Sequence, residues 1–69
     1  MKFEVTDKVS YTTVIMSVED ENGNNFRVTI TEHDWYDDYR VEDWGGEEIE
    51  EGTELYDALV AFCDTELAK

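Results

Sequence analysis

The chain has 69 residues, of which 41% are hydrophobic, and it carries a formal net charge of -14. This length allows a single acidic domain, residues 1–69, close to the smallest size at which a hydrophobic core holds a chain folded. The charge argues against direct binding to nucleic acid or anionic lipid. The first residues contain no apolar run long enough for a signal peptide, and no stretch approaches the roughly 20 apolar residues that span a membrane, so neither element is expected.

The single cysteine, Cys63, permits no internal disulfide, which fits a reducing compartment such as the cytoplasm. We therefore predict a soluble, cytoplasmic protein that is a monomer or a small homo-oligomer. The natural complement of so acidic a chain is a basic protein partner.

The first predicted strand lies near the start of the chain. Residues 2–6 alternate between polar and apolar side chains, with Phe3 and Val5 on one side. Asp7 and Lys8 then predict a turn.

A hairpin is predicted next, because two alternating segments flank a turn signal. Residues 11–18 are rich in β-branched side chains and place Val14, Met16 and Val18 on one face. The pair Asn22–Gly23 tolerates the positive φ angles of a tight turn. Residues 12–19 and 25–31 are therefore predicted to pair as antiparallel strands.

A further short strand is predicted over residues 39–44, with Tyr39 and Val41 pointing inward. Gly45–Gly46 ends it, and in the charged loop that follows only Ile49 is apolar enough to anchor to the body of the protein.

The one predicted helix covers residues 54–68, with Thr53 as its N-cap. It carries a broad apolar stripe that is expected to cover the sheet. The stripe comprises Leu55, Tyr56, Leu59, Val60, Phe62, Cys63 and Leu67. The predicted fold class is α+β, an antiparallel three- to four-stranded β-meander packed against one C-terminal α-helix.

The closest approach to a metal motif begins at Asp20, which with Asn22 and Asn24 matches the first ligand positions of a calcium loop. The sixth position, which requires glycine, is Asn25, and the twelfth, which requires glutamate, is Thr31. A polar hairpin turn is therefore the preferred interpretation.

Other candidate chemical groups are weak. His33 with Asp34 and Asp37 lacks a defined ligand geometry, and the pattern is more typical of a solvated strand end. Cys63 lies beside Asp64 and on the apolar stripe, which favours a buried structural thiol over a nucleophile. We predict no metal, no cofactor and no enzymatic activity.

The most unusual segment is residues 32–54, which holds eleven carboxylates against one arginine and also contains Trp35, Tyr36, Tyr39 and Trp44. Solubility requires far less charge of one sign, and aromatic side chains among charges are typical of binding surfaces. The sequence pattern is compatible with these aromatics as surface anchors and as core residues. The predicted partner-binding residues are Asp34, Trp35, Tyr36, Asp37, Asp38, Glu42, Asp43, Trp44, Glu47, Glu48, Glu50 and Glu51.

Carboxylates two residues apart on a strand are about 6.6 to 6.8 Å apart, comparable to phosphate spacing, so a row of them imitates a nucleic-acid backbone. In size, charge and build the chain resembles the small acidic inhibitors of phages and mobile elements, including DNA mimics and anti-CRISPR proteins. The resemblance includes no specific motif, so no family's binding residues carry over. It implies a phage-encoded inhibitor that evades host defence in the host cytoplasm.

The first hypothesis is therefore an inhibitor that blocks the basic nucleic-acid-binding channel of a nuclease, CRISPR effector, restriction enzyme or polymerase. The second is an immunity-type or antitoxin protein that neutralises one basic toxin. A third is an acidic protein-interaction domain without mimicry, and a plain solvated surface is the simplest interpretation of the charges.

Overall fold

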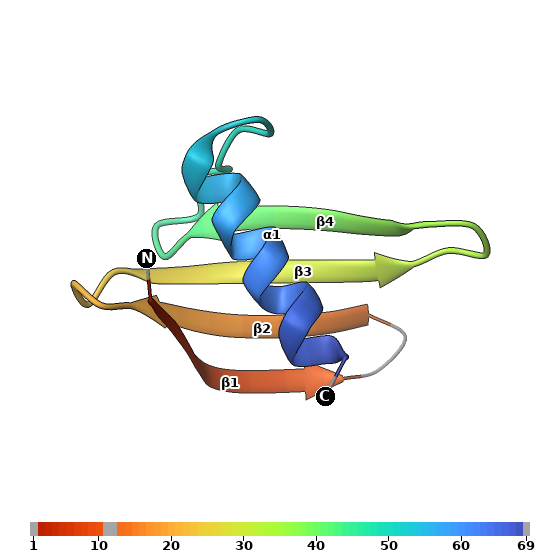
Figure 1. Cartoon of the computed structure of the whole chain (residues 1–69), viewed down its shortest axis with the longest axis horizontal. Coiled ribbons are helices and arrows are strands. Elements are labelled where there is room, and N and C mark those ends of the chain that lie inside the picture. The colour runs from red at the N-terminus through yellow and green to blue at the C-terminus, as the bar shows by residue number, and fades with distance from the viewer. Residues whose placement is uncertain (1, 11–12, 69) are drawn as a thin grey trace.

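The computed structural model describes residues 2–10 and 13–68, which form one antiparallel sheet covered by one helix (Figure 1). The strands are β1 (Phe3–Ser10), β2 (Thr13–Asp20), β3 (Asn25–Glu32) and β4 (Asp37–Asp43), and the helix is α1 (Glu54–Leu67). The strand order in the sheet is β1-β2-β3-β4. The predicted α+β meander with a C-terminal helix is confirmed, with four strands in the sheet.

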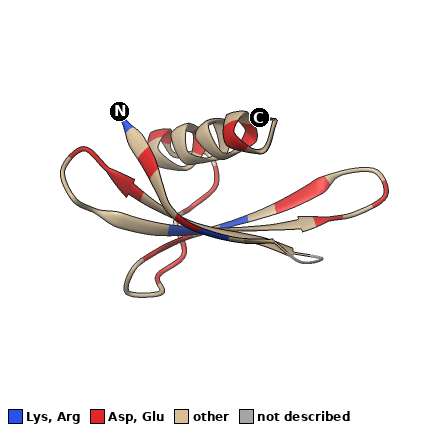
Figure 2. Ribbon diagram, turned by 90° about the horizontal axis from the view of Figure 1, so that it is seen from below, with Lys and Arg blue, Asp and Glu red and all other residues tan. Residues whose placement is uncertain are grey.

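The hydrophobic core lies between α1 and the face of the sheet that it crosses, and no helix of the described residues covers the opposite face (Figure 2). Because side chains alternate along a strand, each central strand contributes every second residue to this core. The buried side chains are Val14, Met16, Val18, Phe26, Val28, Ile30, Val41, Leu59 and Cys63. The predicted apolar face of residues 14–18 is thus confirmed.

The strand β1 is longer than the sequence predicts, because Asp7 and Lys8 lie within it and do not form a turn. The register with β2 shifts between Val5 and Asp7, which leaves Thr6 as the extra residue of a bulge. The Thr6 hydroxyl donates a hydrogen bond to the carbonyl of Ser17 at 3.2 Å. A sheet edge accommodates these polar residues, because pairing with β2 satisfies the backbone while their side chains reach solvent.

The hairpin of β2 and β3 is confirmed, although residues 11 and 12 of its predicted first strand lie outside the described residues. Its turn contains Gly23 at φ +84°, a conformation that favours glycine. The carboxylate of Asp20 accepts the backbone N–H groups of Asn22 and Asn24, both at 2.9 Å. The calcium-like segment is therefore a hairpin turn in which this carboxylate satisfies backbone donors.

The strand β4 begins two residues earlier than predicted and ends at Asp43, so Trp44 lies in the following turn. Tyr39 and Val41 point toward the core as predicted. Ile49 is half-buried against the core, and its N–H donates to the carbonyl of Val41 at 2.8 Å, which confirms it as the anchor of the charged segment.

The helix α1 begins after Thr53, whose side-chain oxygen accepts the N–H of Tyr56 at 3.2 Å, as expected for an N-cap. Its 14 residues present Leu59 and Cys63 as fully buried side chains. Within residues 2–10 and 13–68, no helix has the length and apolar character needed to cross a membrane.

Candidate functional site

The acidic segment, residues 32–54, comprises the last strand of the sheet and the connections before and after that strand. The strand β4 is the edge, the hairpin loop from β3 precedes it, and residues 44–53 lead from it to α1 (Figure 1). The six residue steps from Asp37 to Asp43 span about 20 Å at the usual rise of a strand. The predicted partner-binding residues therefore start from two groups, one in the β3–β4 loop and the start of β4 and one in the turn after β4. Residues 47–49 of the second group run back along the edge of β4, which brings Glu48, Glu50 and Glu51 to the same pocket as Asp38.

Trp35 lies at the tip of the β3–β4 loop, where 92% of its surface is exposed. The loop is closed by the N–H of His33, which donates to the carbonyl of Tyr36 at 2.9 Å. The rings of these two residues stack with their centroids 4.6 Å apart, and Tyr36 is itself 58% exposed. Both predicted aromatics of this loop are thus surface residues, and Trp35 is available as an anchor for a partner.

The imidazole of His33 contacts a carboxylate, but neither of those considered from the sequence. Its Nε2 lies 3.2 Å from the Oδ2 of Asp38, whereas Asp34 and Asp37 do not pair with it. Among the residues that the structure describes, no group of three or more His, Cys, Asp or Glu side chains is placed to hold a metal ion.

The second group lies around the turn after β4, which bends toward the face of the sheet opposite α1 (Figure 2). The Oδ1 of Asp43 accepts the N–H of Glu47 at 3.0 Å, and Gly46 closes the turn at φ +88°. Trp44 is 62% exposed, with its ring centroid 6.0 Å from the guanidinium carbon of Arg27. This tryptophan is thus a surface residue that is partly held by a cation–π contact.

The acidic residues of this edge differ in how far their carboxylates are exposed to solvent. The side chain of Glu42 is only 15% exposed and lies 3.6 Å from Arg40, and Asp43 is half-buried in the turn. The remaining predicted carboxylates are exposed to solvent. These are Asp34, Asp37, Asp38, Glu47, Glu48, Glu50 and Glu51.

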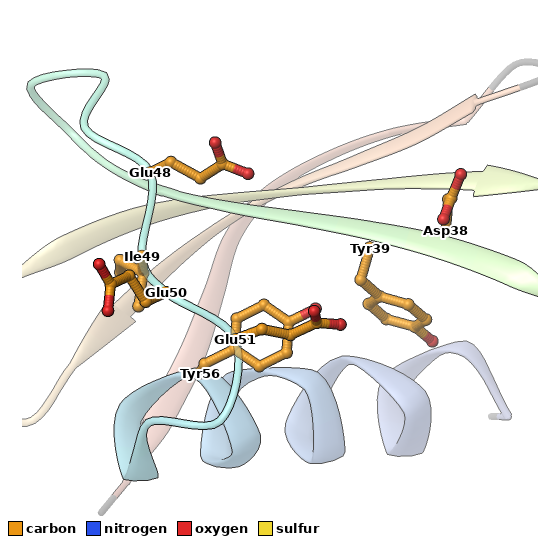
Figure 3. A pocket seen from close by; sticks show the side chains of 7 residues that line it. All are labelled: Asp38, Tyr39, Glu48, Ile49, Glu50, Glu51 and Tyr56. Atoms are coloured by element: carbon orange, nitrogen blue, oxygen red, sulfur yellow. The ribbon is translucent and has the colours of Figure 1, made fainter.

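An open pocket of about 560 Å³ lies between the edge of β4, residues 48–51 and the first turn of α1 (Figure 3). Four carboxylates and three less polar side chains line it. The lining residues are Asp38, Glu48, Glu50, Glu51, Tyr39, Ile49 and Tyr56. The sequence pattern predicts core positions for Tyr39 and Tyr56 and does not predict their place in this pocket. Only the packing of α1 against the sheet brings Tyr56 to β4.

The two tyrosines of the pocket remain neutral well above physiological pH. Burial raises the pKa of Tyr39, and the hydrogen bond that its hydroxyl donates to Asp64 raises the pKa further. Burial also raises the pKa of Tyr56, with the nearby carboxylate of Glu51 as a second cause. The pocket therefore combines negative charge with neutral aromatic walls, a combination suited to a cationic group with an apolar stem.

Cys63 lies in the core and not at this surface. It is 0% exposed, and burial raises the pKa of its thiol to about 11. At neutral pH the thiol is protonated and inaccessible, so it has neither the charge nor the access that a nucleophile needs.

No protein-family model, curated protein sequence or solved structure matches this chain. The exposure, charge and spacing of the residues along β4 are therefore the basis on which a function can be assigned.

Proposed function

We propose that this protein is an inhibitor that imitates nucleic acid and occupies the basic nucleic-acid-binding channel of another protein. Nucleases, restriction enzymes, CRISPR effectors and polymerases are the classes of target that have such a channel. The observation that carries the proposal is the set of seven exposed carboxylates along one edge of a 69-residue domain. The role is one of binding and requires no catalytic group.

Electrostatic attraction supports the proposal. A charge of -14 attracts a basic channel over a distance comparable to the Debye length, about 8 Å at physiological salt. The seven carboxylates would take the place of phosphates on the Lys and Arg side chains of the channel, and association would be fast and sensitive to salt.

The spacing of the charges is compatible with mimicry, although not as an unbroken row. Tyr39, Arg40 and Val41 separate the acidic residues at the two ends of β4, so this strand has no carboxylates two residues apart. Asp37 and Asp43, at the two ends of β4, are about 20 Å apart, roughly three phosphate spacings along one nucleic-acid strand. The two groups would contact two separate sets of cations in one channel.

The proposal is tested by displacement of DNA from purified targets. A labelled duplex is bound to one member of each of the four target classes, and this protein is added at several salt concentrations while anisotropy is followed. At least one target should release the duplex, with inhibition weakening as salt rises. The mimic proposal is wrong if no target releases its duplex at low salt.

Two variants that each lose four negative charges distinguish an effect of the binding site from an effect of the net charge. The site variant is Asp37→Asn, Asp38→Asn, Glu47→Gln and Glu48→Gln, and the control variant is Glu4→Gln, Asp7→Asn, Glu19→Gln and Glu21→Gln. Loss of four exposed pairs should weaken inhibition by about 2 kcal/mol, about thirtyfold in affinity. The control variant should lose much less, and equal losses would mean that only net charge matters.

A second candidate is an antitoxin or immunity-type protein that neutralises one basic toxin. The specific observation that favours it is Trp35, because an aromatic side chain that is 92% exposed is typical of an anchor in a protein interface. Such a complex would not require the nucleic-acid channel, so free DNA would not compete with it. Competition by DNA therefore distinguishes the two candidates.

Trp35 also provides a test of anchoring apart from charge. Trp35→Ala should leave the free energy of unfolding within about 0.5 kcal/mol of the parent, because the side chain has few contacts to lose. Dissociation from the partner should become faster with little change in the association rate. Trp44→Ala is the matched comparison, and it should also lose roughly 0.5 kcal/mol of stability with the Arg27 contact. An unchanged dissociation rate for Trp35→Ala would mean that Trp35 is not an anchor.

A further inference from the structure

The outer edge of β4 is paired over only part of its length. Near its end the edge is covered by residues 47–49, through hydrogen bonds from Asp43 N–H to Glu47 at 2.9 Å and from Ile49 N–H to Val41 at 2.8 Å. The chain then leaves the sheet and turns toward α1 (Figure 1). Within the described residues, no backbone hydrogen bond reaches this edge between residues 37 and 40.

The direction of the backbone groups follows from the period of the strand. Val41 and Asp43 direct their polar backbone groups away from β3, since both bond to residues 47–49. The pairing with β3 is continuous, so groups two residues earlier point the same way. Tyr39 and Asp37 therefore present N–H and C=O groups that no residue of the described chain uses.

The acidic pocket lies beside this open edge. Asp38 and Tyr39 belong to both, and residues 48–51 with Tyr56 form the opposite wall (Figure 3). A strand added along residues 37–40 would extend the sheet where residues 47–49 leave it. Alternate side chains of that strand would lie on the α1 side, toward Tyr39, Glu51 and Tyr56, and on the other side, toward Asp38 and Arg40 (Figure 3).

The negative charge around the open edge determines which kind of strand can pair with it. The exposed carboxylates Asp37, Asp38, Glu48, Glu50 and Glu51 surround it, and Arg40 is the one cation of β4. A second copy of this chain would bring the same carboxylates into opposition, which opposes pairing of two β4 edges. A strand with Lys or Arg at alternate positions has the complementary charge.

We propose that the open edge of β4 binds an extended, Arg- or Lys-bearing segment of the partner as an added strand, with a cationic side chain in the acidic pocket. This inference rests on the proposed function, because it names the part of the target that binds to this edge. The main-chain bonds to Tyr39 and Asp37 would fix the segment, and the aromatic walls would hold the stem of its cationic side chain. The simplest alternative is that the carboxylates only protect the edge from aggregation.

The test uses the whole protein, labelled with nitrogen-15, and the peptide acetyl-Val-Arg-Val-Arg-Val-amide. Binding is measured by amide chemical shifts, and pairing by amide hydrogen exchange. The N–H of Tyr39 should exchange at least about tenfold more slowly with peptide present, because it becomes a ladder donor. Amides that already bond to β3 should change little.

Two further peptides separate pairing from charge. A fully N-methylated peptide of the same sequence keeps both arginines but cannot form the ladder, and a peptide with Gln for Arg keeps the ladder but has no charge. Each should bind at least about tenfold more weakly than the parent peptide. Equal binding of the N-methylated peptide, or binding without protection of Tyr39, would overturn strand addition in favour of charge attraction alone.

Matched protein variants locate the site. Glu48→Gln with Glu50→Gln and Glu51→Gln should weaken peptide binding about tenfold, since each exposed pair contributes a factor of roughly two to five. Glu4→Gln with Glu19→Gln and Glu21→Gln removes the same charge beside a different pocket, at the other edge of the sheet, and should have a much smaller effect.

Failure of this inference is distinguishable from failure of the proposed function. If the peptide does not bind while DNA is still displaced from a target, the edge is only protected by its charges and the mimic proposal stands. If the peptide binds as expected but no target releases DNA, the docking site stands and the mimic proposal is wrong.

Discussion

Cys63 shows how position in the fold determines the chemistry of a single residue. From the sequence, its place on the apolar stripe of the helix predicted a buried structural thiol, and the structure confirms it at 0% exposure. The pKa of the thiol rises from 9.0 to about 11, first because of burial and then because of the charge on Asp64. The neutral thiol is thus part of the folded state.

This pKa predicts loss of stability in alkali. The folded pKa lies above the unfolded one, so the contribution of Cys63 is complete below pH 9.0 and is lost as pH rises to about 11. The free energy of unfolding should fall by up to roughly 3 kcal/mol over that range. Urea denaturation at several pH values checks this, and Cys63→Ala should show a shallower decline. If both proteins lose stability equally, the thiol is not the cause.

The exposure of Trp35, Tyr36 and Trp44 could not be predicted from the sequence. Aromatic residues in a small protein are expected in the core, and the charges around these three suggested a surface without deciding the matter. Their exposure is determined by the register of β3 and β4, which places Trp35 and Tyr36 in the loop and Trp44 in the next turn. Register depends on pairing between segments, which composition does not show.

Secondary-structure elements were predicted well where a local pattern determines them. The β2–β3 hairpin and α1 follow from alternation, a glycine turn and an N-cap, all contained within short segments. The extent of β1 was wrong, because Asp7 and Lys8 are polar and only pairing with β2 keeps them extended. The pocket beside β4 was not predictable, since it is formed by residues from a strand, a connecting segment and a helix.

The N-cap of α1 contributes to the stability of the fold. Thr53 accepts the N–H of Tyr56 and donates to the carbonyl of Glu50 at 2.8 Å, so it joins the acidic segment to the helix. Thr53→Ala should reduce the free energy of unfolding by about 1 kcal/mol, whereas Thr53→Ser keeps the hydroxyl and should lose much less. Denaturation in urea measures both. Equal loss in the two variants would show that the methyl group, and not the cap, is responsible.

Across the whole molecule, repulsion among carboxylates opposes a compact fold. The radius of gyration is 11.3 Å, close to the roughly 11 Å expected for a globular domain of this length, so packing overcomes the net charge of -14. The described cations do not neutralise the edge, since Arg40 is the one cation on β4 and Arg27 lies on the neighbouring strand, whereas seven exposed carboxylates follow this edge.

Added salt should therefore stabilise the protein. Screening weakens repulsion among exposed carboxylates, and a gain of about 1 kcal/mol in a domain of this size raises the melting temperature by roughly 4 to 8 °C. Melting is compared between low salt and about 0.5 M sodium chloride, where the Debye length is well under 10 Å. The four-residue site variant should respond less than the parent. A melting temperature independent of salt would contradict a fold limited by its own charge.

The order of the strands also has a kinetic consequence. Each strand pairs with the one next to it in the sequence, so every hydrogen-bonded ladder closes a short loop of chain. Closing short loops costs little entropy, and proteins rich in such local contacts cross their folding barrier quickly. We therefore expect refolding to be faster than in sheet proteins of similar length whose neighbouring strands are distant in sequence. A chain that refolds quickly exposes its apolar sheet face only briefly, which limits aggregation each time it opens.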